Sequence, residues 1–165
     1  ALPFYITTPI LERLLEKREK IEEVSIIVQK EVAERLAARP GEDDYSSLSL
    51  FVQFFCDVEK LLDIKKKVFF PEPKVDSSLV RLRVLSKPRV DVRDVEALFK
   101  TIRQAFSQRR KTILSALSQK KTRGIPKDRV RAALQRLGID PKSRAETLGL
   151  EDFARISEAL VDISS

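Results

Sequence analysis

The segment from Val68 to Ser78 constrains the fold more than any other part of the sequence. It reads Val-Phe-Phe-Pro-Glu-Pro-Lys-Val-Asp-Ser-Ser and runs directly into Leu-Val-Arg-Leu-Arg-Val-Leu at 79–85, which is typical of a strand. Pro71 and Pro73 each fix φ and lack a backbone donor, and each biases the preceding residue toward extended conformations. We therefore expect a stiff loop that holds an aromatic ring in a set place. In the alternative interpretation the loop is a rigid connector, and Phe69 and Phe70 are ordinary core residues.

A second proline-aromatic stretch stands at the start of the chain, where Pro3 precedes Phe4 and Tyr5. A helix is expected over 8–19, with Thr8 as the N-cap and Pro9 as the first helical residue. Taken alone, this stretch indicates only where a helix begins. Together with the loop at 68–78, it provides two proline-fixed aromatic groups that could flank a flat ligand such as a base.

Hydrophobic periodicity predicts a mixed α/β first part and an all-helical second part. Residues 21–28 are apolar enough to indicate a strand buried on both faces, as in a parallel sheet. Residues 46–55 fit a helix or a strand equally well on period alone. Residues 86–89 form a linker, and Gly138 is a good stop for a helix. The other predicted elements are a strand at 77–85 and helices at 29–38, 91–106, 108–119, 126–137 and 150–162.

The charge is concentrated in the second part of the chain. Residues 1–85 carry 14 Lys and Arg against 15 Asp and Glu, whereas residues 86–165 carry 18 against 10, so the second part accounts for the formal net charge of +7. Such asymmetry indicates that the helical part faces a polyanion. The alternative is a set of solvated helix faces that are rich in Lys and Arg.

Cysteine and histidine usage excludes several kinds of chemistry. The single cysteine, Cys56, cannot form an internal disulfide, which fits a reducing cytoplasmic setting, and its apolar neighbours are typical of a buried residue rather than a nucleophile. The chain has no histidine, so His-based general bases, triads and His-containing metal sites are excluded, and no metal site is expected. No apolar run approaches the ~20 residues of a membrane span.

Four stretches give the chain a resemblance to a known family, in the order and spacing of that family. They are Leu-Pro-Phe-Tyr-Ile-Thr-Thr-Pro-Ile at 2–10, Val-Gln-Lys-Glu-Val-Ala-Glu-Arg-Leu at 28–36, Phe-Phe-Pro-Glu-Pro-Lys-Val-Asp-Ser at 69–77 and Ala-Phe-Ser-Gln-Arg-Arg-Lys-Thr at 105–112. With these motifs, the chain resembles the ribosomal RNA adenine dimethyltransferases over essentially its whole length. The resemblance implies a helix at 46–55 and a strand at 57–64.

The resemblance further implies an α/β plus all-α fold. Residues 1–86 would be the C-terminal portion of a Rossmann-like class I methyltransferase domain, and residues 87–165 a helical RNA-binding domain. Family members hold S-adenosylmethionine with a Gly-rich loop after a first strand, and none of the four glycines here stands in such a loop. We therefore expect a C-terminal fragment that lacks most of the cofactor site and is inactive alone. Its exposed sheet edge should favour self-association.

By resemblance, the activity is dimethylation of adenine N6 in small-subunit ribosomal RNA. In the family motif Asn-Leu-Pro-Phe/Tyr, the Asn side chain and a neighbouring backbone carbonyl accept the hydrogens of the target amine. Leu2 stands at the position of that carbonyl in this chain. Pro3 would shape the turn, and Phe4 and Phe69 would stack on the two sides of the base. Ala1 stands where the family has Asn, so the side-chain acceptor is missing.

The expected RNA contacts are basic side chains, which supply affinity and register through phosphates. Two alternatives from other classes remain open: a non-catalytic nucleic-acid-binding module, such as a transcription-factor relative of this fold, and a structural adaptor for protein contacts. Candidates for RNA binding are Lys74, Arg81, Arg109, Arg110, Lys111, Lys120, Lys121 and Arg123.

Overall fold

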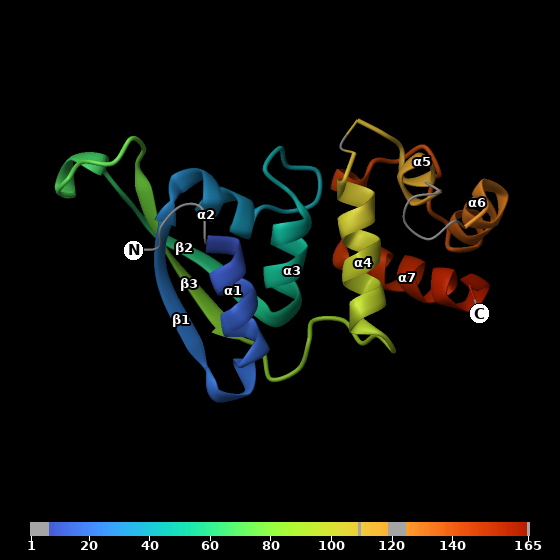
Figure 1. The fold of residues 1–165 in the computed structure, drawn as a ribbon, viewed down its shortest axis with the longest axis horizontal. Coiled ribbons are helices and arrows are strands. Elements are labelled where there is room, and N and C mark those ends of the chain that lie inside the picture. The colour runs from blue at the N-terminus through green and yellow to red at the C-terminus, as the bar shows by residue number, and fades with distance from the viewer. Residues whose placement is uncertain (1–6, 109, 119–124, 165) are drawn as a thin grey trace. The chain divides into compact units, whose positions relative to one another are not determined.

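The computed structural model describes residues 7–108, 110–118 and 125–164 (Figure 1). The chain forms two compact units. The first comprises residues 1–38 and 51–89, and the second comprises residues 39–50 and 90–165. The segment 39–50 thus belongs to the second unit, whereas the division expected from the resemblance includes it in the first domain, residues 1–86.

The first unit contains a three-stranded sheet in the order β1-β3-β2, where β1 is Glu23–Gln29, β2 is Cys56–Ile64 and β3 is Ser77–Val84. Both pairings are antiparallel. The prediction of a strand at 21–28 is confirmed with shifted bounds, but its assignment to a parallel sheet buried on both faces is wrong. Exposed and covered positions alternate at the start of β1, and only Ile26 and Val28 are buried, because antiparallel sheets can keep one face in solvent.

Helices α1 (Thr7–Glu16) and α2 (Lys30–Ala37) lie on one side of this sheet (Figure 1). Leu11, Leu15 and Leu36 are buried, and so are Val80 and Leu82 of β3. Helix α1 begins at Thr7, so Thr8 and Pro9 lie in its first turn rather than at the cap and first position. A short 3₁₀ helix, η2 (Arg18–Lys20), replaces the expected final turn.

Helix α3 (Ser47–Phe55) confirms the helix at 46–55, and β2 confirms the strand that follows it. Within the first unit, the Gln53 side chain donates to the backbone oxygens of Leu36 and Ala38, each at 2.9 Å. These bonds satisfy carbonyls at the C-terminus of α2 that lack an intrahelical partner. The guanidinium of Arg18 lies 4.7 Å from the ring centroid of Phe55, a cation–π contact.

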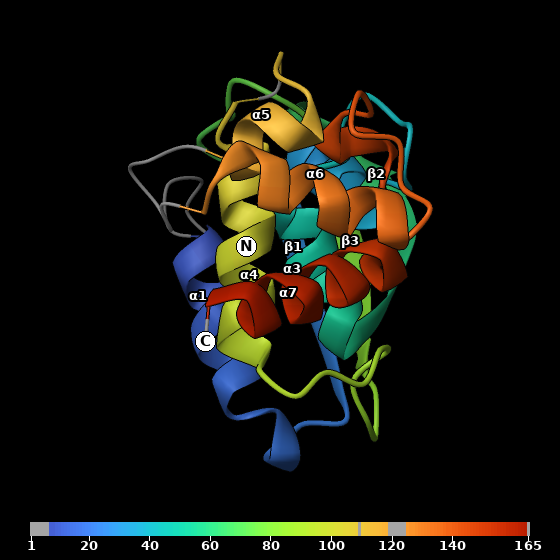
Figure 2. The ribbon, with the colours of Figure 1, turned by 90° about the vertical axis from the view of Figure 1, so that its right-hand side faces the viewer.

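The second unit contains α4 (Val95–Phe106), α5 (Ile113–Leu117), α6 (Lys127–Arg136), η4 (Ala145–Thr147) and α7 (Leu150–Ser164). Figure 2 shows α7 crossing α4, and the two helices pack together. Asp94 caps α4 by accepting from the Ala97 amide at 2.9 Å. Gly138 follows α6 with φ of +72°, as expected for a helix stop.

Two features differ from the sequence-based expectation for this unit. Helix α5 is much shorter than the predicted 108–119, because Thr112 caps it by accepting from the Ser115 amide and the preceding residues form a turn. Tyr45, from the segment 39–50, is buried in this unit. Its ring meets the Phe106 ring edge-on at 5.9 Å, and its hydroxyl donates to the Leu148 oxygen at 3.1 Å.

Candidate functional site

We call residues 65–76, which connect β2 to β3, the aromatic loop; it extends beyond the strand ends (Figure 1). It opens with a 3₁₀ turn, η3 (Lys66–Val68). Phe69 is half-buried, whereas the Phe70 side chain is fully exposed. The interpretation of both rings as core residues is therefore wrong for Phe70, and Phe69 keeps part of its ring surface accessible.

Asp76 closes the aromatic loop. Its carboxylate accepts from the Lys66 amide at 3.0 Å and from Lys65 Nζ at 2.9 Å, so the two ends of the loop are joined. Its backbone oxygen accepts from the amide of Lys30, the first residue of α2, at 3.0 Å. The Lys66 amide and the Lys65 ammonium, in that order of effect, hold the pKa of the Asp76 carboxyl below its usual range. We call the three hydrogen bonds that Asp76 accepts, from the Lys66 amide, Lys65 Nζ and the Lys30 amide, the Asp76 clasp.

Replacing Asp76 with alanine should open the aromatic loop. The matched substitution Asp76→Asn keeps an acceptor for the Lys66 amide but loses the charge that pairs with Lys65, so its effect should be smaller. Trypsin cleaves after lysine, so nicking at Lys65, Lys66 and Lys67 reports the opening, because cleavage of a loop follows the population of its open form. We expect severalfold faster nicking in Asp76→Ala. Equal nicking rates in all three proteins would contradict the clasp.

The same clasp predicts a pH dependence. The folded pKa of Asp76 is lowered, so the carboxylate stabilises the loop at all pH values above the ordinary pKa of Asp, about 4. That contribution is lost as the pH falls through the lowered pKa. Hydrogen exchange of the loop amides, corrected for intrinsic rates, should show protection that declines only at acid pH. Protection in Asp76→Ala should lack this decline.

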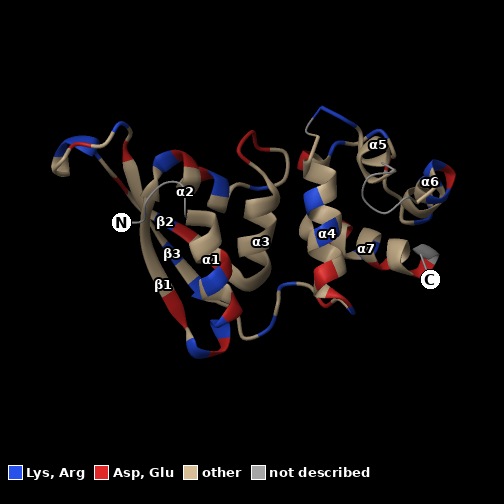
Figure 3. Cartoon of the chain, in the orientation of Figure 1, with Lys and Arg blue, Asp and Glu red and all other residues tan. Residues whose placement is uncertain are grey.

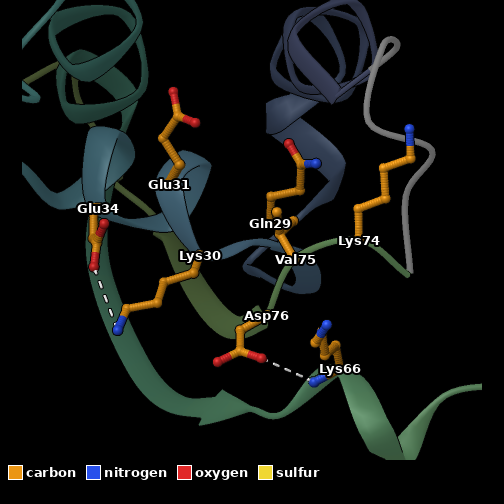
Figure 4. A pocket seen from close by; sticks show the side chains of 8 residues that line it. All are labelled: Gln29, Lys30, Glu31, Glu34, Lys66, Lys74, Val75 and Asp76. Atoms are coloured by element: carbon orange, nitrogen blue, oxygen red, sulfur yellow. Dashed lines mark hydrogen bonds and ion pairs between the residues drawn. The ribbon is translucent and has the colours of Figure 1, made fainter. Parts of the chain in front are cut away.

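A pocket of about 410 Å³ lies beside the aromatic loop, where β1 ends and α2 begins (Figure 4). The sequence had given no role to its Gln29-Lys30-Glu31 portion. The signal was present, since these residues lie inside one of the four family-like stretches, but their nearness to the loop depends on the fold. The lining residues are Gln29, Lys30, Glu31, Glu34, Lys66, Lys74, Val75 and Asp76.

The pocket is balanced in charge, with three lysines and three carboxylates in its lining. Lys30 Nζ lies 3.4 Å from Asp63 and 3.9 Å from Glu34, and Lys66 Nζ lies 3.2 Å from Glu72. The Lys74 ammonium makes no ion pair within the described part of the chain, and Figure 4 shows it pointing away from Asp76. The balance suits a neutral ligand with polar edges better than a highly charged one.

The predicted RNA contact Arg81 lies in a different setting. On β3, its Nε is 3.3 Å from Glu23 and a terminal nitrogen is 3.4 Å from Glu59, so carboxylates from both neighbouring strands compensate its charge. The buried Nε donates no well-aligned hydrogen bond. These contacts favour a structural role in the sheet, and RNA binding by Arg81 stays a prediction.

In the second unit, Arg110 and Lys111 are exposed and lie in the turn between α4 and α5, which Figure 3 shows as basic. They precede the helix rather than start it. The Arg109, Lys120, Lys121 and Arg123 predictions fall outside the described residues. So do Ala1, Leu2, Pro3 and Phe4, the predicted second half of the base pocket. These assignments stay predictions.

Cys56 is buried, and burial raises the pKa of its thiol to about 11, so it is a packing residue as predicted. Across 7–108, 110–118 and 125–164, no three Cys, Asp or Glu side chains are grouped to hold a metal ion. No helix in the described ranges is long and apolar enough to cross a membrane.

The described residues do not fit a site for S-adenosylmethionine. Gly41 and Gly138 have positive φ, but the first lies in the connection between α2 and α3 and the second ends α6. Gly149 precedes α7. None of these three glycines follows a strand and opens a helix, as a nucleotide-binding loop requires.

Two solved structures are similar to this chain in fold. The first is a dimethyladenosine transferase from Plasmodium falciparum, with a TM-score of 0.82 and 25% identity over 94% of this chain and 63% of that one. The second is the 23S rRNA methyltransferase ErmE, with a TM-score of 0.67 and 26% identity over 97% and 63%. The fold is thus shared with part of a dimethyladenosine transferase and part of an rRNA methyltransferase.

The sequence comparison identifies the family to which the chain belongs. The family model "Ribosomal RNA adenine dimethylase" matches residues 1–162, and the chain belongs to this family, whose members use S-adenosylmethionine. It is 46% identical over 162 residues to ribosomal RNA small subunit methyltransferase A of Bacillus cytotoxicus and, equally, to that of Bacillus cereus. In each case 97% of this chain is covered, and the chain spans 55% of the relative's length.

Proposed function

We propose that this chain is the C-terminal part of a Rossmann-like methyltransferase, joined to a helical RNA-binding unit. The whole protein would transfer two methyl groups from S-adenosylmethionine to N6 of adenine in small-subunit ribosomal RNA. The observation that carries this proposal is the clasped aromatic loop. This loop carries the partly accessible Phe69, and its residues Lys66, Lys74, Val75 and Asp76 line one side of a charge-balanced pocket.

The chemistry explains why such a loop is needed. The N6 amine is a poor nucleophile because its lone pair is delocalised into the ring, so the enzyme must hold it in line with the methyl group. The base has to leave its stack to reach the site, and aromatic stacking stabilises an extruded base by about 1–3 kcal/mol. Phe69 would supply one stacking face, and the Asp76 clasp would keep that face in place.

The remaining parts of the site are assigned by family membership. Phe4 would form the other stacking face, Pro3 would shape the turn, and the Leu2 carbonyl would accept a hydrogen of the amine. Ala1 removes the side-chain acceptor of the family motif. The cofactor would be held by residues of the kind that the longer relatives carry beyond the region matched here.

The test is methyl transfer from labelled S-adenosylmethionine to unmethylated small ribosomal subunits. The chain would be compared with a chimera in which it follows the N-terminal region of the Bacillus cereus relative, with either Ala or Asn at position 1. We expect labelled adenine with the Asn chimera, less with the Ala chimera and none with the chain alone. A chimera that binds the subunits but transfers no methyl group would favour the non-catalytic module.

Self-association is a linked proposal. In the described residues β1 pairs with β3 only, so its other edge has open hydrogen-bonding groups. We expect the chain alone to associate at high concentration in sedimentation velocity and the chimera to remain monomeric. Monomeric behaviour of both proteins would refute association through the β1 edge.

A further inference from the structure

Strand β2 carries a β-bulge shortly before the aromatic loop. The register between β2 and β3 shifts between Lys60 and Leu62, so Leu61 is an extra residue in β2. Such a bulge reverses the alternation of the residues that follow, and bulges are common beside functional sites, where they re-aim a side chain. Without it, Lys60 and Asp63 would point to opposite faces of the sheet. Here Lys60 Nζ lies 3.4 Å from Asp63 Oδ1, so the bulge turns Asp63 to the face that carries Lys60.

On that face, Asp63 contacts residues of two neighbouring elements. Ser78 of β3 is fully buried, and its hydroxyl donates to Asp63 Oδ1 at 2.6 Å. The other carboxylate oxygen lies 3.4 Å from Nζ of Lys30, the first residue of α2. The Ser78 hydroxyl is the main cause that lowers the pKa of the Asp63 carboxyl, so this group is ionised at neutral pH. We call Ser78, Asp63 and Lys30 the strand-end brace.

The strand-end brace lies at the base of the aromatic loop. The last residues of β1 and β2 pair there with the first residue of β3. Lys30 is held twice, because its amide donates to the Asp76 oxygen and its ammonium faces Asp63. Lys30 also lines the pocket beside the loop. The brace therefore fixes one wall of the pocket relative to the loop.

Lys30 has a competing partner on its own helix. Its Nζ lies 3.9 Å from Glu34, one turn further along α2 (Figure 4). The side chains of Lys30, Glu34 and Asp63 are between 35% and 43% exposed, and ion pairs at such positions contribute little to the free energy of unfolding. Asp63 thus affects mainly the direction of the Lys30 side chain, toward the strand ends rather than along α2.

We propose that Asp63 is a positioning residue of the candidate site, which acts by holding Lys30 and the start of α2 against the base of the aromatic loop. This inference rests on the proposed function. Asp63 does not line the pocket itself, so it acts through Lys30. Transfer of a methyl group in line with the N6 lone pair depends on geometry, and small misplacements of the base are costly.

The first test requires no activity and uses the chain as it stands. Hydrogen exchange of the Lys30 amide, which donates to Asp76, reports how firmly α2 is held to the loop. Asp63→Asn keeps an acceptor for the Ser78 hydroxyl but loses the charge that attracts Lys30, so we expect severalfold faster exchange. The matched control is Lys60→Gln. It removes the other ammonium 3.4 Å from the same carboxylate, but Lys60 belongs to β2 and does not connect it to α2, so exchange should be unchanged. Equal exchange in Asp63→Asn and the unmodified chain would overturn the brace.

The second test is methyl transfer by the Asn chimera. Asp63→Asn and Lys30→Gln should each lower kcat roughly three- to tenfold with little change in KM, and the double variant should lose no more than the weaker single variant. Asp63→Glu should restore most of the rate because it keeps the charge, and Lys60→Gln should leave the rate within about twofold. The Tm of Asp63→Asn should stay within about 2 °C of that of the unmodified chimera. A merely structural role would lower Tm and kcat together.

The outcomes separate the two proposals. If the unmodified chimera transfers no methyl group, the proposed function is wrong and the positioning role fails with it, while the exchange experiment still decides whether Asp63 holds Lys30. If the chimera is active and Asp63→Asn matches its kcat, the positioning role is wrong and the proposed function stands. Losses that multiply in the double variant would show that Asp63 and Lys30 act independently, which also contradicts the inference.

Discussion

Replacing Phe69 with alanine in the chimera should lower kcat/KM for methyl transfer by about 5- to 150-fold. This range is the loss of one stacking face, about 1–3 kcal/mol, with a factor of ten for every ~1.4 kcal/mol. Phe69→Tyr should keep most of the activity, because a tyrosine ring stacks equally well. The measurement is the initial rate of label transfer at several concentrations of unmethylated small subunits.

The neighbouring residue supplies the matched control. Phe70 has the same side chain one position further along the loop, but it is fully exposed. Phe70→Ala should leave the rate within about twofold, as is usual for surface positions. A large loss with Phe70→Ala and none with Phe69→Ala would show that the wrong ring has been assigned to the base.

Replacing Phe153 with alanine should destabilise the second unit by about 3–5 kcal/mol. The ring is fully buried on α7, and its centroid lies 6.0 Å from that of Phe106 on α4, so truncation leaves a cavity between packed helices. Amide exchange in α4 and α7 should accelerate by roughly two to four orders of magnitude. RNA binding by this unit should weaken in parallel, because the basic turn between α4 and α5 depends on this core.

Val95→Ala is the control for that experiment. Val95 begins α4 and is 38% exposed, so its truncation should change exchange in the unit only slightly. Exchange in β1 and β3 should be nearly unchanged in Phe153→Ala. If α4 and α7 keep their protection without the Phe153 ring, the core of this unit is not where the burial pattern places it.

The sequence predicted which segments are strands better than how they pair. Alternation identified β3, and Val80 and Leu82, which alternate along it, are both buried. The apolar run around Ile26 was read as part of a parallel sheet, because a continuous apolar run is typical of both buried parallel strands and covered antiparallel ones. Pairing direction depends on where β3 returns, and that information is not local. The length of α5 was missed because the cap at Thr112 competes with a longer amphipathic pattern.

The candidate site was predicted in part, and the missing part has the same physical origin. Pro71 and Pro73 predicted a stiff loop, and the Val-Asp-Ser portion belongs to one of the family-like stretches. No local pattern predicts that the Asp76 carboxylate accepts a hydrogen bond from the Lys66 amide. Likewise, the bridge between Thr112 and Arg144 joins segments that are some thirty residues apart, and no local pattern predicts it.

The division of the chain has a consequence for exchanging parts between relatives. The backbone passes from one unit to the other after residues 38, 50 and 89, so the linker at 86–89 is not the only crossing. A helical module cut at that linker would lose Tyr45, and with it a buried ring against Phe106 and a bond to Leu148. Recombination that swaps the helical unit has to carry residues 39–50 along, as an insertion within the partner's first unit. Any hybrid that exchanges the helical unit of this chain faces the same requirement.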